Sequence, residues 1–342
     1  MIVNQIHRTF EDAVRDQLIP GGVLLVGTDE KVLFHQAFGT LDGHIPTRPN
    51  SIYDLASVTK VVSTLPVILT LYQQGQIDLE DPIQRYIPVE SKEILIRHLL
   101  THTSGYPPYS EGWRYTKTSD ELTNLIFSTQ PQRLPEQEVV YSCLNFILLM
   151  KLAEAVTGDF KGFLRDQICA SLQMNDTRYC PEQSSSIAPT SIREDRRLQG
   201  QVDDELAYYL GGVSGNAGLF SHAADLCRYA QAWLNPGRLL VPTLMKRATQ
   251  PWTDSISGDR KGLGWMLFTH RASCGALFSD RSFGHTGFTG TSLWIDPLNQ
   301  IFVVLLTNRV YYRRHDRPEL IWAFRRKIHT LSMAAKEQEE WK

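Results

Sequence analysis

Residues 54–75 read D-L-A-S-V-T-K-V-V-S-T-L-P-V-I-L-T-L-Y-Q-Q-G, and this stretch decides the fold. From Ser57 to Gln74 the apolar residues cover nearly every side of a predicted helix, and Gly75 is a typical helix stop. A helix that is apolar nearly all round lies inside a protein. We therefore expect the molecule to be built around this helix, with Ser57 at its N-terminal end.

Strand-like runs lie near both ends of the chain. Residues 20–39 predict a β-hairpin, because two apolar runs flank the turn-forming residues T-D-E-K. Three short apolar runs follow near the C-terminus, at residues 263–268, 292–297 and 301–308, with D-P-L-N-Q as the turn between the last two. The simplest architecture is one antiparallel sheet formed by both ends of the chain.

Helical periodicity dominates the middle of the chain. Helices are predicted at residues 5–18, 94–100, 119–127, 145–156, 223–234 and 318–335. The long polar connection at 181–209 has the length of a functional loop. We predict an α+β fold of the α/β-sandwich type, in which helices flank the sheet. Residues 1–77 and 246–342 would form a mixed α/β subdomain, and residues 78–245 a mostly helical inserted subdomain.

The bulk composition excludes several classes of protein. The net charge of −2 gives no basic face for nucleic acid, and the apolar run at residues 21–27 is too short to span a bilayer. The N-terminal residues M-I-V-N-Q-I-H-R lack the pattern of a signal peptide, which predicts a cytoplasmic protein as written, or an exported one whose leader was removed. The five cysteines are odd in number and have no C-x-x-C spacing, which indicates reduced thiols without a zinc site.

Ser57 and Lys60 form the first candidate site. Residues three apart share a helix face, so the lysine amine can reach the serine hydroxyl, which needs a base to become a nucleophile. Burial would lower the pKa of the lysine and suit it to that role, and the N–H groups at the helix start could hold an oxyanion. The alternative is a serine that only caps the helix; we expect Ser57 both to cap the helix and to be the nucleophile.

Two further stretches carry polar groups that could take part in catalysis or substrate binding. Tyr141 precedes a predicted helix in V-V-Y-S-C-L-N, and a tyrosine beside a lysine ammonium loses its proton more easily. The glycine-rich stretch S-F-G-H-T-G-F-T-G, residues 282–290, places His285 and Thr286 where the backbone can approach a ligand. Taken alone, Tyr141 is best interpreted as a buried aromatic residue, and the alternative for the second stretch is an ordinary glycine-rich turn with an incidental histidine.

Together these pieces resemble the serine β-lactamase and penicillin-binding-protein-like hydrolases, in the branch of class C β-lactamases, D,D-peptidases and family VIII-type esterases. S-V-T-K (57–60), Y-S-C (141–143) and H-T-G (285–287) stand in the order of the S-x-x-K, Y-x-N and K-T-G motifs. Further matching stretches are R-H-L-L-T-H-T-S-G (97–105), G-G-V-S-G-N-A-G-L-F-S (211–221) and L-L-T-N-R-V (305–310).

The resemblance implies a β-lactamase/transpeptidase-like fold with the site between the two subdomains. Ser57 would form an acyl-enzyme, with Lys60 and Tyr141 shuttling protons. The backbone N–H groups of Ser57 and Phe288 would form the oxyanion hole. The H-T-G residues His285, Thr286 and Gly287 would contact the substrate, and no metal or organic cofactor would take part.

This sequence departs from the family pattern at two places. Cys143 stands where the family has Asn or Asp, and a thiol is a weak hydrogen-bonding group. Asn145 could compensate for it. His285 replaces a lysine and carries less charge at neutral pH, which weakens the grip on a carboxylate and favours esters or peptides over β-lactams.

Two other polar features have competing interpretations. The acidic run at residues 203–205 is either a solvated loop or, by the resemblance, a part of the cleft in which Asp204 binds a cationic or hydroxylated group of the substrate. His102, in T-H-T-S-G, is expected to hold a turn below the site.

We therefore expect a serine hydrolase that cleaves an ester or amide. Carboxylesterase, D-amino-acid or muropeptide peptidase or amidase, and weak β-lactamase all remain open, as does a catalytically weak penicillin-binding or ligand-binding homologue. Its partner would be a small ester, amide or peptidoglycan fragment.

Overall fold

A six-stranded sheet joins the two ends of the chain. In this computed structural model, which describes residues 1–312 and 318–341, the strand order is β10-β11-β12-β13-β1-β2 and every neighbouring pair is antiparallel. The strand bounds are Gly21–Gly27 (β1), Val32–Gly39 (β2), Met266–Leu267 (β10), Phe283–Thr286 (β11), Ser292–Asp296 (β12) and Ile301–Thr307 (β13). The predicted hairpin and the predicted sheet of both ends are confirmed, although β10 is shorter than expected.

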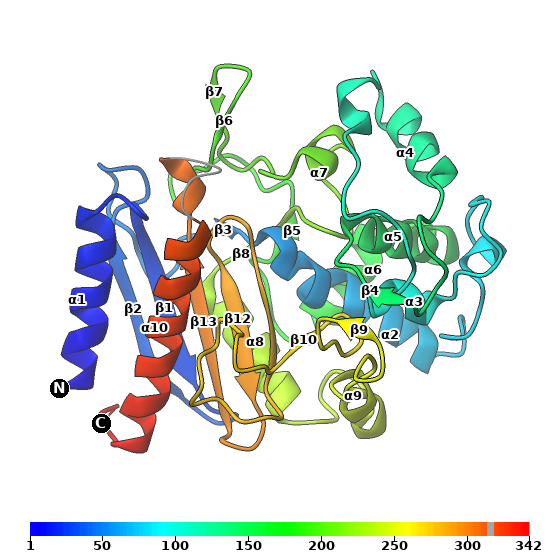
Figure 1. Cartoon of the computed structure of the whole chain (residues 1–342). Helices are drawn as coiled ribbons and strands as arrows, with labels where there is room; N and C mark the ends of the chain where they lie inside the picture. The colour runs from blue at the N-terminus through cyan, green and yellow to red at the C-terminus, as the bar shows by residue number, and fades with distance from the viewer. Residues whose placement is uncertain (313–317, 342) are drawn as a thin grey trace.

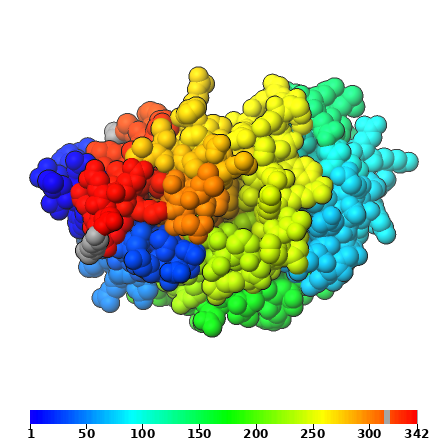
Figure 2. Space-filling view, turned by 90° about the horizontal axis from the view of Figure 1, so that it is seen from below, coloured from blue at the N-terminus to red at the C-terminus, as the bar shows by residue number. Residues whose placement is uncertain are grey.

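Helices cover both faces of this sheet. On one face lie α1 (Ile2–Arg15) and α10 (Pro318–Glu337), side by side, and α8 (Ala223–Leu234) packs on the other face against β1, β12 and β13. Figure 1 shows this layered half, with α10 in front of the strands and α1 at the left edge beside β2. The space-filling view in Figure 2 shows the first and last parts of the chain in contact on one side of the molecule.

The alternation of side chains along the strands explains the two layers. In β1, Val23 and Leu25 belong to the core shared with the middle of the chain, whereas Leu24 and Val26 belong to the core beneath α1 and α10. Successive residues of a strand point to opposite faces, so a strand buried on both sides needs apolar residues at every position. This is why the strands read as continuous apolar runs.

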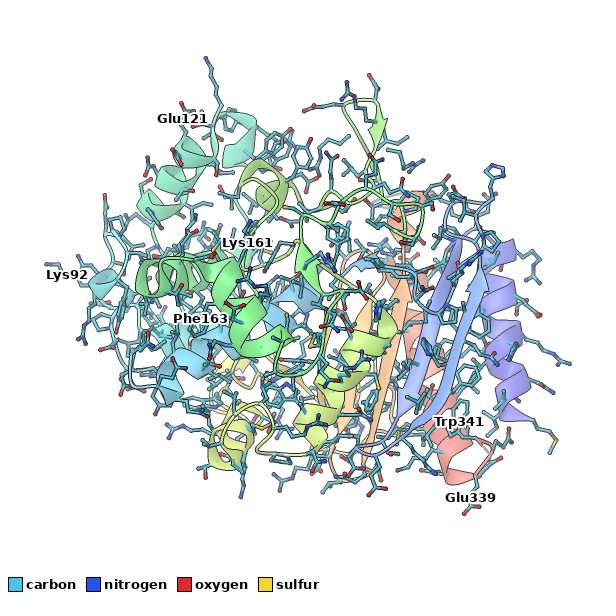
Figure 3. All side chains as sticks on the ribbon, turned by 180° about the vertical axis from the view of Figure 1, so that it is seen from behind. Lys92, Glu121, Lys161, Phe163, Glu339 and Trp341 are labelled. Carbon is cyan, nitrogen blue, oxygen red and sulfur yellow. The ribbon has the colours of Figure 1, made fainter. Side chains whose placement is uncertain are left out.

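The rest of the molecule is mainly helical. Its helices are α2 (Leu65–Gln73), α3 (Ile96–Leu100), α4 (Ser119–Ser128), α5 (Cys143–Thr157), α6 (Phe160–Phe163), α7 (Glu205–Tyr209) and α9 (Pro242–Ala248). Figure 3, from behind, shows α4 and α6 on this side, marked by Glu121, Lys161 and Phe163, and Glu339 and Trp341 at the far end near α1. The predicted helix at 145–156 is α5, whose start lies two residues earlier.

Short strands connect the helical part. A three-stranded sheet has the order β3-β8-β5 and consists of Tyr53–Asp54, Leu219–Ser221 and Arg178–Tyr179. A parallel pair consists of β4 (Glu138–Val139) and β9 (Ser257–Gly258). A hairpin consists of β6 (Ile192–Arg193) and β7 (Arg196–Arg197). The division into 1–77 with 246–342 and 78–245 stays a prediction. The structure adds that α8, from the second segment, packs on the sheet.

Candidate active site

Ser57 lies in a tight 3-10 turn, Ala56–Val58, at the start of the buried helical segment. Ala56 has a φ of +46°, a left-handed conformation that residues other than glycine rarely adopt. Because the turn starts at this residue, Leu55 takes the N-cap position and no side chain caps the helix. The prediction that Ser57 is also a helix cap is therefore wrong. Its Oγ instead accepts a hydrogen bond from Lys60 Nζ at 2.9 Å.

Lys60 is fully buried, and three groups surround its ammonium. Besides Ser57 Oγ, Nζ contacts the carbonyl oxygen of Asn216 at 2.9 Å and Cys143 Sγ at 3.8 Å. The segment that follows, Lys60–Thr64, is a π-helix, a distortion that often occurs at functional sites. The predicted i, i+3 contact between serine and lysine is present.

The charge on Lys60 differs from the expectation. Burial acts to lower the pKa of Lys60, but the negative forms of Cys143 and Tyr141, together with Asp204, outweigh burial and raise the pKa above its ordinary value. The expectation that burial would lower this pKa is wrong. In the resting protein Lys60 is an ammonium that donates to the serine.

Tyr141 lies directly against this pair, just before α5. The Lys60 Nζ is 5.1 Å from the centre of the tyrosine ring. Burial holds the pKa of Tyr141 above its ordinary value, although the positive charge of Lys60 acts to lower it. The structure thus brings Ser57, Lys60 and Tyr141 together.

His102 supports the tyrosine from the turn after α3. Its Nδ1 accepts the backbone N–H of Ser142 at 3.1 Å, and its ring centre lies 4.7 Å from that of Tyr141. Burial and the nearby charges of Lys261 and Lys60 hold the pKa of His102 well below its usual value. The hydrogen bond of its ring with the backbone of Ser142 agrees with the predicted structural role of His102.

The H-T-G stretch packs directly on the turn that carries Ser57. A side chain at Gly287 would meet the carbonyl oxygen of Leu55 at 2.5 Å and Ala56 Cβ at 3.3 Å, so only glycine permits this approach. The hydroxyls of Thr289 and Thr291 donate to the carbonyl oxygens of Asp54 (2.8 Å) and Leu55. These contacts place the end of β11 beside the serine.

The remaining residues of this stretch occupy different positions. Phe288 is 42% exposed and lines the pocket beside Ser57, and its carbonyl oxygen accepts a hydrogen bond from Arg309. His285 is buried, with Nδ1 2.8 Å from the carbonyl oxygen of Thr286 and its ring centre 6.0 Å from that of Tyr141. Burial and the charge of Lys60 keep the pKa of His285 well below its usual value, so its imidazole is neutral. The oxyanion role of Phe288 stays a prediction.

The position of Cys143 leaves Lys60 with a weak partner. Burial raises the pKa of Cys143, so its thiol is protonated at neutral pH. Asn145 does not replace it, because its Oδ1 accepts from the hydroxyl of Ser104 at 2.7 Å and its amide nitrogen faces His102. The expected compensation by Asn145 is therefore absent, since this helical position points away from the lysine.

A pocket of about 370 Å³ opens beside Ser57, and one of its walls is acidic. Its lining residues are Ala56, Ser57, Tyr109, Glu111, Trp113, Arg114, Tyr141, Cys143, Asp203, Asp204, Glu205, Ala217 and Phe288. Asp204 is half-buried, and its Oδ1 accepts from the N–H of Ala207, as the N-cap of α7, and from the amide of Asn216. Asp203 is buried and accepts the hydroxyl of Ser191, so the solvated-loop interpretation is wrong for it.

Sequence reasoning missed three residues of this region. Asn216 holds Lys60 through its carbonyl and Asp204 through its amide, and the glycine-rich stretch 211–221 was the available signal. Asp54 accepts the N–H groups of Ala56 and Asp203, and burial raises its pKa to about 7. The third residue is Lys261, whose Nζ lies 5.7 Å from the centre of the Tyr141 ring. No local sequence pattern predicted that this lysine would lie there.

The part of the chain that the structure describes holds neither a metal-binding cluster nor a helix that could span a membrane. Within residues 1–312 and 318–341, no three or more His, Cys, Asp and Glu side chains gather in a way that could bind a metal ion. In the same ranges, none of the helices has the length and apolar character needed to cross a bilayer.

Comparison with known proteins decides the family. The family model described as Beta-lactamase matches residues 6–325. The chain belongs to the β-lactamase family. A protein of Escherichia coli K12 named "Putative D-alanyl-D-alanine carboxypeptidase" is 29% identical over 90% of this chain and 82% of its own length.

Similar solved structures confirm the predicted fold. The octameric penicillin-binding protein homologue from Pyrococcus abyssi aligns with a TM-score of 0.77 and 20% identity, over 98% of this chain and 78% of that one. EstCE1, a hydrolase with promiscuous acyltransferase activity, aligns with a TM-score of 0.74 and 19% identity over 96% and 98%. The predictions of the family, of its fold and of a serine hydrolase are confirmed.

Proposed function

We propose that this β-lactamase-family hydrolase cleaves small peptides of the peptidoglycan type through an acyl-enzyme on Ser57, and accepts simple esters by the same route. The observation that carries the proposal is the hydrogen bond from Lys60 Nζ to Ser57 Oγ beside an open pocket, with the Tyr141 ring 5.1 Å from the same ammonium. The relative named as a carboxypeptidase supports the peptide substrate.

The charges favour Tyr141 as the group that takes the proton of the serine. Lys60 is an ammonium whose Nζ donates to Ser57 Oγ, so it has no lone pair to accept a proton in the resting state. Its charge stabilises a phenolate on Tyr141. In the reactive form Tyr141 has released its proton to solvent and is a phenolate; Ser57 Oγ then attacks the carbonyl, the serine proton passes to this phenolate and from it to the leaving group, and water later releases the acyl group.

The oxyanion would be held by the backbone N–H groups of Ser57 and Phe288. The start of a helical segment and the end of β11 meet at this place, held by the threonine hydroxyls of the following turn. Such preorganised donors stabilise the charge that develops on the carbonyl oxygen. Thr286 and His285 lie next to them, where they would contact the polar end of the substrate.

The direct test is the hydrolysis of two substrates by one preparation. We expect release of D-alanine from a peptide ending in D-alanyl-D-alanine and release of p-nitrophenol from p-nitrophenyl butyrate, with each substrate inhibiting turnover of the other. Penicillin should inhibit both by acylating the same serine. Turnover of the ester without any release of D-alanine, at millimolar peptide, would contradict the peptide substrate.

Cys143→Asn should shift the substrate preference toward amides. An asparagine side chain offers a full acceptor to Lys60 and a donor to a substrate amide, whereas the thiol is weak at both. We expect the ratio of kcat/KM for penicillin or peptide to kcat/KM for p-nitrophenyl butyrate to rise about tenfold. Cys143→Ala is the matched control and should leave this ratio unchanged; an equal rise in both variants would show that only volume matters.

Asp204→Asn tests the acidic wall of the pocket. Asparagine can still accept the N–H of Ala207, so the cap of α7 is kept while the charge is removed. We expect kcat/KM to fall about tenfold for a peptide with a cationic side chain and to change little for a neutral one. Asp195→Asn, on an exposed turn of the same long connection, is the control. Equal effects on the two peptides would remove Asp204 from substrate recognition.

A further inference from the structure

A second buried lysine lies beside Tyr141, and the chemistry proposed above gives it no role. Lys261 comes from the loop before β10 and is only 2% exposed. Its Nζ lies 5.7 Å from the centre of the Tyr141 ring, close to the 5.1 Å that separates the Lys60 Nζ from the same ring. Two lysine side chains therefore lie beside one phenol, and burial holds the pKa of Lys261 below its ordinary value.

The surroundings of Lys261 leave its charge poorly neutralised. Its ammonium forms an ion pair with Asp259 at 3.3 Å, and that carboxylate is 72% exposed. An exposed carboxylate is screened by water and compensates a buried charge only weakly. The ionisable groups that face Lys261 from the neighbouring elements are Lys60, His102, Tyr141 and His285. Both histidines are neutral there, so the field at the tyrosine is positive.

The sheet explains why a lysine of this loop reaches the site. Lys261 forms a β-bridge with Met266, and Met266 pairs with Gly284 on β11, next to His285. Lys261 thus lies along the same edge as position 285, where the K-T-G motif carries a lysine and this chain carries a histidine. The positive charge that the K-T-G motif places at position 285 on β11 is carried in this chain by Lys261, in the loop before β10.

We propose that Lys261 supplies Tyr141 with the second positive charge that the histidine form of the third motif lacks, and so acts as a positioning residue for proton transfer. This inference rests on the proposed function. The residues that line the described pocket do not include Lys261, so its effect reaches the substrate through Tyr141. A nearby cation favours the phenolate over the phenol and makes the tyrosine a base at lower pH.

The pH dependence of kcat/KM for p-nitrophenyl butyrate in Lys261→Met tests this role. Methionine keeps the length of the side chain and removes its charge. We expect about a tenfold loss of kcat/KM at pH 7, and a rise of activity with pH that is displaced upward by about one unit. The difference from wild type should therefore shrink as the pH increases, while KM for this neutral ester changes little. A loss of the same size at every pH would show a structural role and overturn the proposal.

Two further variants separate charge from packing. Lys261→Arg keeps the charge and should retain the wild-type pH profile. Adding His285→Lys to Lys261→Met returns a cation to the same edge and should bring the profile back toward wild type. If Lys261→Met does not fold, judged by circular dichroism, the comparison of Lys261→Gln with Lys261→Arg answers the same question. The proposal is contradicted if Lys261→Arg loses the wild-type pH profile and the double variant also does not bring it back.

The failure of this inference and that of the proposed function have different signatures. If Ser57→Ala retains full activity, the acyl-enzyme on Ser57 is wrong. If Ser57→Ala is inactive and Lys261→Met shows the wild-type pH profile, the acyl-enzyme stands and only the role of Lys261 is wrong.

Discussion

Ser57→Ala should abolish the hydrolysis of p-nitrophenyl butyrate, with kcat lowered by at least about 10³-fold, or about 4 kcal/mol of transition-state stabilisation. The hydroxyl is the only nucleophile proposed for the acyl-enzyme, and alanine removes it without changing the turn. The serine side chain accepts a hydrogen bond from Lys60, and removing this bond should change the melting temperature little. Mass spectrometry with penicillin should show a covalent adduct on the wild type and none on this variant.

Ser63→Ala is the matched control for that experiment. Ser63 lies on the same helical segment, but its hydroxyl contacts the hydroxyl of Tyr179 at 2.9 Å, away from Lys60. Its loss should lower the stability by about 1 kcal/mol and leave kcat nearly unchanged. Equal activities of wild type and Ser57→Ala would instead assign the turnover to another group and overturn the mechanism.

Tyr141→Phe should lower kcat by about 10² to 10³-fold, because the proton of Ser57 loses its acceptor. The ring remains, and with it the contacts to Lys60, His102 and His285, so the fold should be preserved. The pH dependence should lose the step that reports the tyrosine. A variant with normal kcat and an unaltered pH profile would return the role of base to Lys60.

Tyr106→Phe is the control for the loss of a tyrosine hydroxyl. The hydroxyl of Tyr106 is buried and has no hydrogen-bond partner among residues 1–312 and 318–341. Removing it should leave kcat unchanged and keep or raise the melting temperature, because an unpaired buried hydroxyl is unfavourable.

Local periodicity was enough to predict most of the layered half of the fold. The helix at 223–234 was predicted with the bounds of α8, and the runs at 292–297 and 301–308 became β12 and β13. The long connection at 181–209 was harder, because its hairpin, β6 and β7, has charged and exposed residues with no apolar alternation. Such a hairpin is stabilised by contacts that sequence periodicity does not report.

The site shows the same division between local and distant contacts. The pair of Ser57 and Lys60 followed from helix geometry alone, because residues three apart share a face. The contact of Asn216 with Lys60 and the approach of Lys261 to Tyr141 depend on how distant segments pair in space. The sign of the pKa shift of Lys60 was missed for that reason, since burial was visible in the sequence, whereas the groups whose negative forms raise this pKa, Cys143, Tyr141 and Asp204, are distant from Lys60 along the chain.

The strand order gives this enzyme a built-in delay during its synthesis. β1 pairs on one side with β2, which follows it at once, and on the other with β13, from the far end of the chain. At ribosomal rates of synthesis, one edge of β1 therefore stays unpaired for on the order of tens of seconds before β13 is made. During this time the exposed edge can bind chaperones or pair with another chain and aggregate. A half-made chain already carries Ser57 but lacks Phe288 and the turn that holds it. On the proposed mechanism, the nascent protein stays inactive until its last strands emerge.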